Sequence, residues 1–137
     1  MSMADTNGII RAYLAADTGL TALVGARIYC PRLPENATLP AVGFFTRGGT
    51  ATPYIPDMPN PSVQFDCWAD DPIEARSIYL KLYDALQGIQ NVEVTVGGVI
   101  YYINAIEEVQ GQDLVDMEIP NYFRVLCFFS IMIRRKA

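Results

Sequence analysis

The sequence predicts an α+β fold in which a mostly antiparallel sheet has two helices packed on one face. Three observations lead to this prediction. Residues 63–69 alternate with a period of two and run into a helical pattern over 72–86 with almost no linker. A hairpin pattern follows at 91–106, and a long strand pattern ends the chain. The length of 137 residues fits one domain, residues 1–137.

The strand–helix unit carries the clearest local signals. Within Val63–Ala69 the odd-numbered residues share one face of a strand and the even-numbered residues share the other. Asp70 and Asp71 offer N-cap carboxylates, and Pro72 suits the first helical turn because its missing N–H is not needed there. Apolar residues then recur at spacings of three and four, which predicts one buried stripe, and Gly88 is the expected stop.

Weaker patterns precede this unit. A first helix is expected over 7–16, capped by Asp5 or Thr6, followed by one more helical turn over 20–24. Residues 27–29 begin an extended stretch, and residues 41–46 form a strand.

The last part of the chain reads as strands. A hairpin joins 91–95 to 99–106 through the glycine pair at 97 and 98, which tolerates the positive φ of a tight turn. The final strand, residues 122–134, is apolar on both faces, so both faces need a cover. Two helices can cover one face. The other face needs a second sheet layer or a neighbouring subunit.

Two long loops are predicted, at about 47–61 and 107–121. The first is rich in Gly, Thr and Pro, and the second alternates acidic and apolar residues. Connections of about fifteen residues are long for a compact domain and usually indicate function or mobility.

The composition favours assembly over phosphate binding. Hydrophobic residues make up 51% of the chain and charged residues only 18%, so part of the surface is expected to be buried permanently against other subunits. The net charge of −5 argues against nucleic-acid binding as the main function, because that affinity comes largely from Lys and Arg. An acidic protein can still line a channel through which DNA passes without sticking.

No catalytic, cofactor or metal site is predicted. The chain contains no histidine, which excludes Ser-His-Asp and Cys-His arrangements. The three cysteines, Cys30, Cys67 and Cys127, lie far apart in apolar runs and are expected to be small core residues in a reducing compartment. No signal peptide or membrane-spanning run is seen, which predicts a soluble protein made in the cytoplasm that does not interact with membranes.

A few side chains are candidates for a protein interface. Trp68 is either an interface anchor or part of a second core layer, and Tyr54 lies in the first long loop. Apolar residues between the acids of the second loop could dock onto a partner, and basic residues at the end of the last strand could pair with an acidic loop of a neighbour. These are Leu114, Met117 and Ile119 in the loop, and Arg134 and Arg135 in the strand.

One set of motifs is similar to a known family. The pattern runs through Leu20–Tyr29 (LTALVGARIY), a proline-bearing loop, Leu39–Val42 (LPAV), Val63–Ala69 (VQFDCWA) and the helix that contains Glu74 and Ala75. It resembles the tail-completion or tail-terminator proteins of long-tailed phages and covers most of the chain. The motifs concern packing and turns, with no catalytic signature among them. The resemblance implies that residues 1–137 form one tail-terminator-like domain.

The resemblance implies a structural virion protein at the head–tail junction, assembled in the host cytoplasm. It would be a homo-oligomer, a hexameric ring that caps the tail tube. Its partners would be the tail tube protein and the head-completion or stopper protein, and DNA would pass through without specific binding. The alternatives are a head-completion (stopper) ring protein, a small-molecule-binding domain or enzyme, and a monomeric adaptor.

Overall fold

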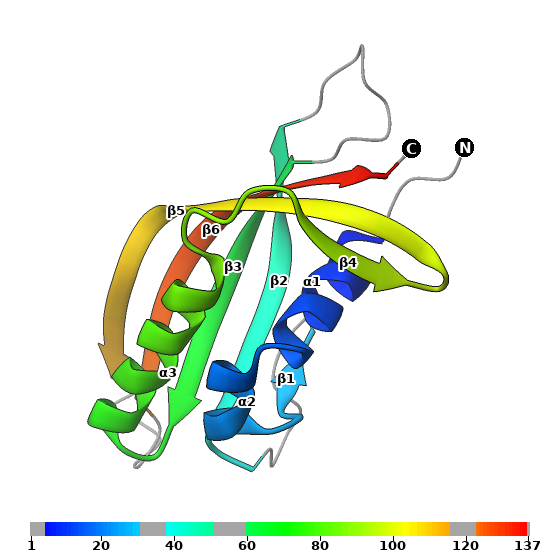
Figure 1. Cartoon of the computed structure of the whole chain (residues 1–137). Coiled ribbons are helices and arrows are strands. Elements are labelled where there is room, and N and C mark those ends of the chain that lie inside the picture. Colours follow the sequence, from blue (N-terminus) through cyan, green and yellow to red (C-terminus); the bar gives the residue numbers. More distant parts are fainter. Residues whose placement is uncertain (1–4, 31–37, 51–59, 116–122, 137) are drawn as a thin grey trace.

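Over the residues that the structure describes, the fold is a curled six-stranded sheet with three helices on one face (Figure 1). The structure is a computed structural model that describes residues 5–30, 38–50, 60–115 and 123–136. The elements are α1 (Thr6–Ala15), α2 (Thr18–Val24), β1 (Ile28–Tyr29), β2 (Ala41–Thr50), β3 (Asn60–Ala69), α3 (Pro72–Leu86), β4 (Val92–Val96), β5 (Val99–Val115) and β6 (Phe123–Arg135).

The strands lie in the order β1-β2-β3-β6-β5-β4. Only the short β1–β2 pair is parallel, and every other described pair is antiparallel, so the sheet is mostly antiparallel. β3 and β6 form the centre. α3 leaves β3 and leads to β4 at the far edge of the sheet, which places this helix across β3, β6 and β5 (Figure 1).

Each helix begins at an aspartate that caps it. The side chains of Asp5, Asp17 and Asp71 accept hydrogen bonds from backbone N–H groups of the first turn, at 3.2, 2.9 and 3.0 Å. The cap at Asp17 explains a difference from the prediction. What reads in the sequence as one extra helical turn is a separate seven-residue helix, so the helical layer contains three helices where two were predicted.

The predicted hairpin is confirmed. β4 and β5 pair from Val92 opposite Ile103 to Val96 opposite Val99. Gly97 and Gly98 have φ values of 59° and 79°, as a two-residue hairpin turn with positive φ at both positions requires.

The second long loop was wrongly predicted over most of its length. Residues 107–115 continue β5 and pair with β6 as far as Val115 opposite Phe123. Two register shifts, between Glu107 and Val109 and between Val109 and Gln112, interrupt the alternation that would otherwise have shown a strand. Likewise, Arg47–Thr50 ends β2 and Asn60–Pro61 begins β3, so the first loop is shorter than predicted. Residues 51–59 and 116–122 lie outside the described residues.

The core lies between the helices and the sheet. Phe65 on β3 stacks on Phe44 of β2 and meets Phe129 of β6 edge to face, with ring centroids 5.7 Å apart in both pairs. Leu14, Leu20, Ile78 and Leu82 of the three helices are fully buried against these strands. Cys67 and Cys127 are also fully buried, so the prediction that they are core residues is confirmed.

Candidate interaction surfaces

The face of the sheet turned away from the helices, here called the outer sheet face, is not covered by any helix or strand of the described residues. The even-numbered residues of β3 and β6 lie on it, because their odd-numbered neighbours fill the core. Its large side chains are half-buried or exposed. They are Phe45, Trp68, Tyr102, Ile106, Val109, Leu126, Phe128 and Met132. Of the two covers that the sequence analysis left open, a second sheet layer is thus not found within the described ranges.

Arginine guanidinium groups lie over aromatic rings of the outer sheet face. The guanidinium carbon of Arg47 lies 4.0 Å from the ring centroid of Phe128, and that of Arg124 lies 5.0 Å from Trp68. Arg134 lies 4.3 Å from the ring centroid of Tyr102. These contacts order the guanidinium groups while leaving N–H groups to donate elsewhere.

Asp66 is the one acidic residue that the described parts of β2, β3 and β6 contain. It is 9% exposed and lies 3.6 Å from Arg124, and the amide of Gln64 donates to it at 3.3 Å. Burial raises the pKa of the Asp66 carboxyl, and Arg124 and Gln64 oppose this shift only in part. The arginines therefore give the outer sheet face a basic character.

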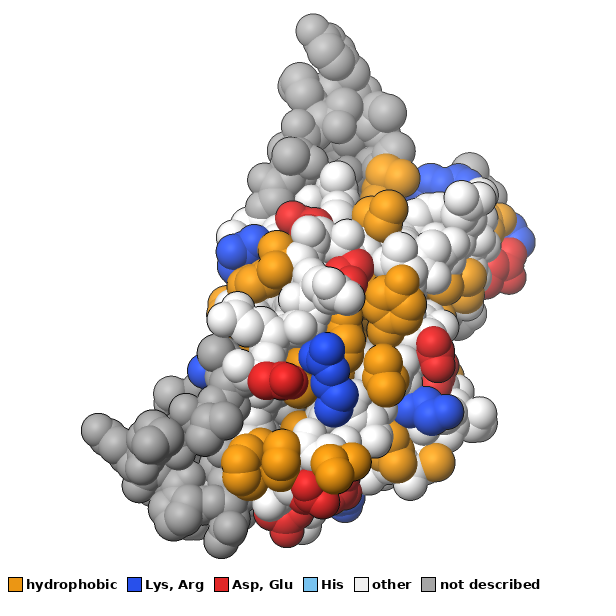
Figure 2. All heavy atoms as spheres, turned by 90° about the vertical axis from the view of Figure 1, so that its left-hand side faces the viewer, with side chains coloured by type: hydrophobic (Ala, Val, Ile, Leu, Met, Phe, Trp, Pro, Cys, Tyr) orange, Lys and Arg blue, Asp and Glu red, His pale blue; other side chains and the backbone are white. Residues whose placement is uncertain are grey.

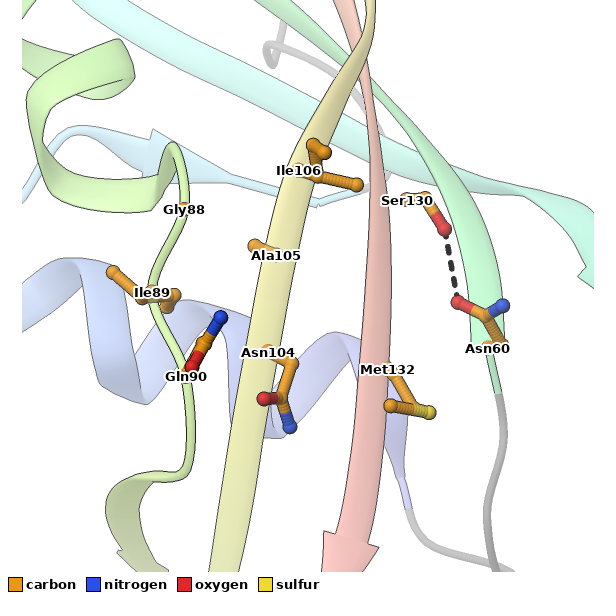
Figure 3. Close-up of a pocket in the computed structure, with 9 residues that line it drawn as sticks. All are labelled: Asn60, Gly88, Ile89, Gln90, Asn104, Ala105, Ile106, Ser130 and Met132. Atoms are coloured by element: carbon orange, nitrogen blue, oxygen red, sulfur yellow. Dashed lines mark hydrogen bonds between the residues drawn. The ribbon is translucent and has the colours of Figure 1, made fainter.

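A hollow of about 350 Å³ lies on the outer sheet face beside the segment that leaves α3 (Figure 3). Its polar lining consists of amides and one hydroxyl, from Asn60, Gln90, Asn104 and Ser130, and Ser130 donates to Asn60 at 2.9 Å. No lining residue is ionisable. The lining of the hollow therefore has no acid or base that could activate the Ser130 hydroxyl.

The exposed apolar side chains gather on two elements. Large hydrophobic residues that are more than a third exposed all belong to α3 and β5 in the described part of the chain. They are Ile73 (75%), Leu80 (53%), Tyr83 (36%), Ile106 (58%) and Val109 (45%). Figure 2 views the molecule from the side that carries α3 and the end of β5, and hydrophobic clusters there alternate with charged groups. We call the exposed side of α3 and the edge of β5 next to it the α3–β5 flank, whereas the Ile106 and Val109 side chains of β5 lie on the outer sheet face.

The flank contains an open groove of about 530 Å³ between the start of α3 and the end of the sheet. Ile73 and Leu80 line it on the helix, and Phe123 lines it on β6. The ion pair between Arg76 and Asp113, at 3.5 Å, also borders the groove. Both partners are largely exposed, so this pair adds little to stability.

Side chains of α3 and of its C-cap residue form hydrogen bonds with backbone groups on the unpaired edge of β5. The Tyr79 hydroxyl donates to Glu107 at 2.6 Å and accepts from the Gly111 N–H at 3.0 Å. The Gln87 side chain accepts from the Glu107 N–H at 2.7 Å, and Arg76 donates to the Gly111 carbonyl. Burial, aided by the hydrogen bond to Glu107, raises the pKa of Tyr79 to about 12, so the hydroxyl keeps its proton at neutral pH. This cluster closes a sheet edge that could otherwise pair with another strand.

The structure places the predicted interface residues in different regions. Trp68 and Arg134 lie on the outer sheet face, where Arg134 also donates to Asn91 at 3.1 Å. Arg135 is exposed at the end of β6. Leu114 belongs to β5, opposite Arg124 in the register. Tyr54, Met117 and Ile119 lie outside the described residues.

Sequence reasoning missed several exposed residues. Ile73 and Leu80 lie seven residues apart on the polar side of α3, and this spacing was a signal that they share a helix face. Arg47 and Arg124 had no such signal, because each stacks on a ring from another strand. Only the register of the sheet brings these pairs together.

The described residues contain no group of three or more acidic or cysteine side chains placed to hold a metal ion. Burial raises the pKa values of the Cys67 and Cys127 thiols, which keeps them protonated. None of the helices within the described ranges is long and apolar enough to cross a membrane.

Comparison with known proteins gives a likeness of fold. The sequence matches no known family model and no curated protein. The structure is similar to a chain in the virion of the native gene transfer agent (GTA) particle, with a TM-score of 0.61 and 16% sequence identity. The similarity covers 96% of this chain and 98% of that chain. At this identity the comparison shows a common fold over nearly the whole chain.

Proposed function

We propose that this protein is a structural virion protein of a long-tailed phage, a tail terminator that forms a ring on the completed tail tube and joins it to the head. The observation that carries the proposal is the fold, which over 96% of the chain is similar to that of a chain in a virion particle. The resemblance of the LTALVGARIY, LPAV and VQFDCWA motifs to tail-completion proteins supports the same assignment from the sequence.

The surfaces support a function based on assembly. An outer sheet face of aromatic side chains and arginines, together with an exposed apolar flank, is typical of protein interfaces. A closed ring needs two different surfaces on each subunit, because one patch of a subunit meets a different patch of the next. The tail tube protein and the head-side stopper would then contact the two rims of the ring, and the ring would be a hexamer. The net charge of −5 suits a channel through which DNA passes without binding.

The proposal is tested by deleting the gene for this chain from the genome that carries it and imaging the particles by electron microscopy. We expect overlong tails, or tails that do not join heads, and rescue when the chain is supplied in trans. Tails of normal length that attach to heads would contradict the proposal. Tails of normal length that remain separate from filled heads would instead indicate the stopper function, which binding of the purified chain to the head-side adaptor would then establish.

A further inference from the structure

Two surfaces of this chain carry opposite charge. By the strand register, the outer sheet face of the described residues carries Arg47, Arg124 and Arg134 and two acids, Asp66 and Glu93, and Lys136 lies over the Tyr102 ring beside Glu93. α3 and β5 contain five acids and two bases, the acids being Glu74, Asp84, Glu107, Glu108 and Asp113 and the bases Arg76 and Lys81. The outer sheet face thus carries more bases than acids, and the α3–β5 flank carries more acids than bases because of the carboxylates of β5.

Both surfaces also carry apolar side chains that are exposed to solvent in an isolated chain. Ile73 and Leu80 on the helix are 75% and 53% exposed. On the outer sheet face the rings of Trp68 and Phe128 are only half-buried, with Arg124 and Arg47 stacked on them. Arginines ordered in this way are weakly hydrated and present N–H groups to carboxylates, so covering them with an acidic surface costs less than covering free lysines.

We infer that the helical side of the α3–β5 flank of one copy binds the outer sheet face of the next copy. The contact joins two different surfaces, so each copy binds one neighbour through α3 and another through the sheet. The complementary charges select this pairing, because flank against flank and sheet face against sheet face would each bring like charges together. The inference rests on the proposed ring and names the surfaces that build it.

The two surfaces can be blocked separately. Ile73→Lys with Leu80→Lys puts two positive charges on the helical side of the flank, and Ile106→Glu with Val109→Glu puts two negative charges on the outer sheet face. All four side chains are between 45% and 75% exposed, so the fold should tolerate the changes. Ala15 and Ala22 are exposed on α1 and α2, and their double Lys and double Glu variants are matched controls with the same changes in charge.

Native mass spectrometry and sedimentation velocity of the purified chains give the readout. We expect wild type and controls to form species larger than dimers, and each blocked variant to self-associate at least about a hundredfold more weakly, about tenfold for each lost apolar contact. A mixture of the two blocked variants should associate more strongly than either variant alone, because the intact flank of one fits the intact sheet face of the other.

Other results overturn the inference. A blocked variant that still forms dimers by itself would show that its intact surface binds the same surface of a second copy. A mixture that stays monomeric while wild type assembles shows that the two surfaces do not meet. A wild-type chain that stays monomeric at every concentration, and yet restores tails in the deletion experiment, leaves the proposed function standing and assigns these surfaces to other virion proteins.

Discussion

At the scale of single residues, the Tyr79 hydroxyl makes the most consequential polar contacts in the described chain. It joins α3 to β5 through Glu107 and the Gly111 N–H. The backbone of Gly111 also lies so close to the ring that an added Cβ would come within 2.6 Å of it. Residue 111 therefore has no room for a side chain beside the Tyr79 ring.

Tyr79→Phe should lower the free energy of unfolding by about 1–3 kcal/mol, because it removes the partner of a carboxylate and of a backbone N–H. Urea denaturation followed by fluorescence measures the change. Tyr83→Phe is the matched control, since this tyrosine is on the same helix and is 36% exposed. Equal effects of the two substitutions would show that the hydroxyl of Tyr79 adds nothing.

Asp66 should make stability depend on pH. Burial raises its pKa above the ordinary value of 3.8, so the folded chain holds this proton more tightly than the unfolded chain. The resulting stabilisation is complete below the unfolded pKa and is lost as the pH rises through the folded pKa. Asp66→Asn should therefore compare more favourably with wild type at about pH 7 than at about pH 3.5.

Urea midpoints across this pH range measure the effect. Asp70→Asn is the control, because that carboxylate precedes α3 in an exposed position. Curves of wild type and Asp66→Asn that stay parallel across the range would mean that the folded protein leaves the proton affinity of Asp66 unchanged.

At the scale of the elements, the caps of α1 and α3 could be predicted, and the cap of α2 and the extent of β5 could not. Asp71 sits directly before Pro72 and caps α3, as the sequence predicts for one of two neighbouring aspartates. β5 was missed because its bulges shift the alternation at Glu107 and Val109. A pattern with a period of two cannot survive an inserted residue, although the pairing with β6 resumes beyond it.

Asp71→Ala should lower the free energy of unfolding by about 1 kcal/mol, because the Ile73 N–H loses its acceptor in the first turn. Asp70→Ala should have little effect, since Asp71 is the residue that caps the helix. The unfolding temperatures of the two variants show whether Asp71 or Asp70 caps the helix. The reverse order of effects would assign the cap to Asp70.

At the scale of the whole molecule, the order of the strands predicts which strands unfold locally most often. β3 and β6 have a bonded neighbour on each side and lie under α3, whereas β1 and β4 are edge strands of two and five residues. Backbone amides of β3 and β6 should therefore exchange with deuterium most slowly, and those of β1 and β4 much faster. Hydrogen exchange with mass spectrometry tests this order. Slow exchange in β4 would show that α1, which packs on it, protects that edge.

The opposite charges of the outer sheet face and the α3–β5 flank are also a property of the whole molecule. Arg47 is far in the chain from Arg124 and Arg134 of β6, yet the sheet register brings all three to one face. Trp68 and Arg134 could be named as interface candidates from the sequence, because a lone tryptophan on a strand and a basic strand end can each be recognised without knowledge of their neighbours in space. Arg47 and Leu80 could not, because their significance depends on their neighbours in space.

The sequence by itself determined the α+β class, the hairpin, the caps of α1 and α3 and the burial of Cys67 and Cys127. These features follow from hydrophobic periodicity and from local hydrogen bonds, which depend on residues close together in the chain. The tertiary structure alone decided that α2 is a helix of its own, that β5 extends to Val115, and that the arginines stack on aromatic rings of one sheet face. Those outcomes depend on pairing between distant segments, because packing energies add up only once those segments meet.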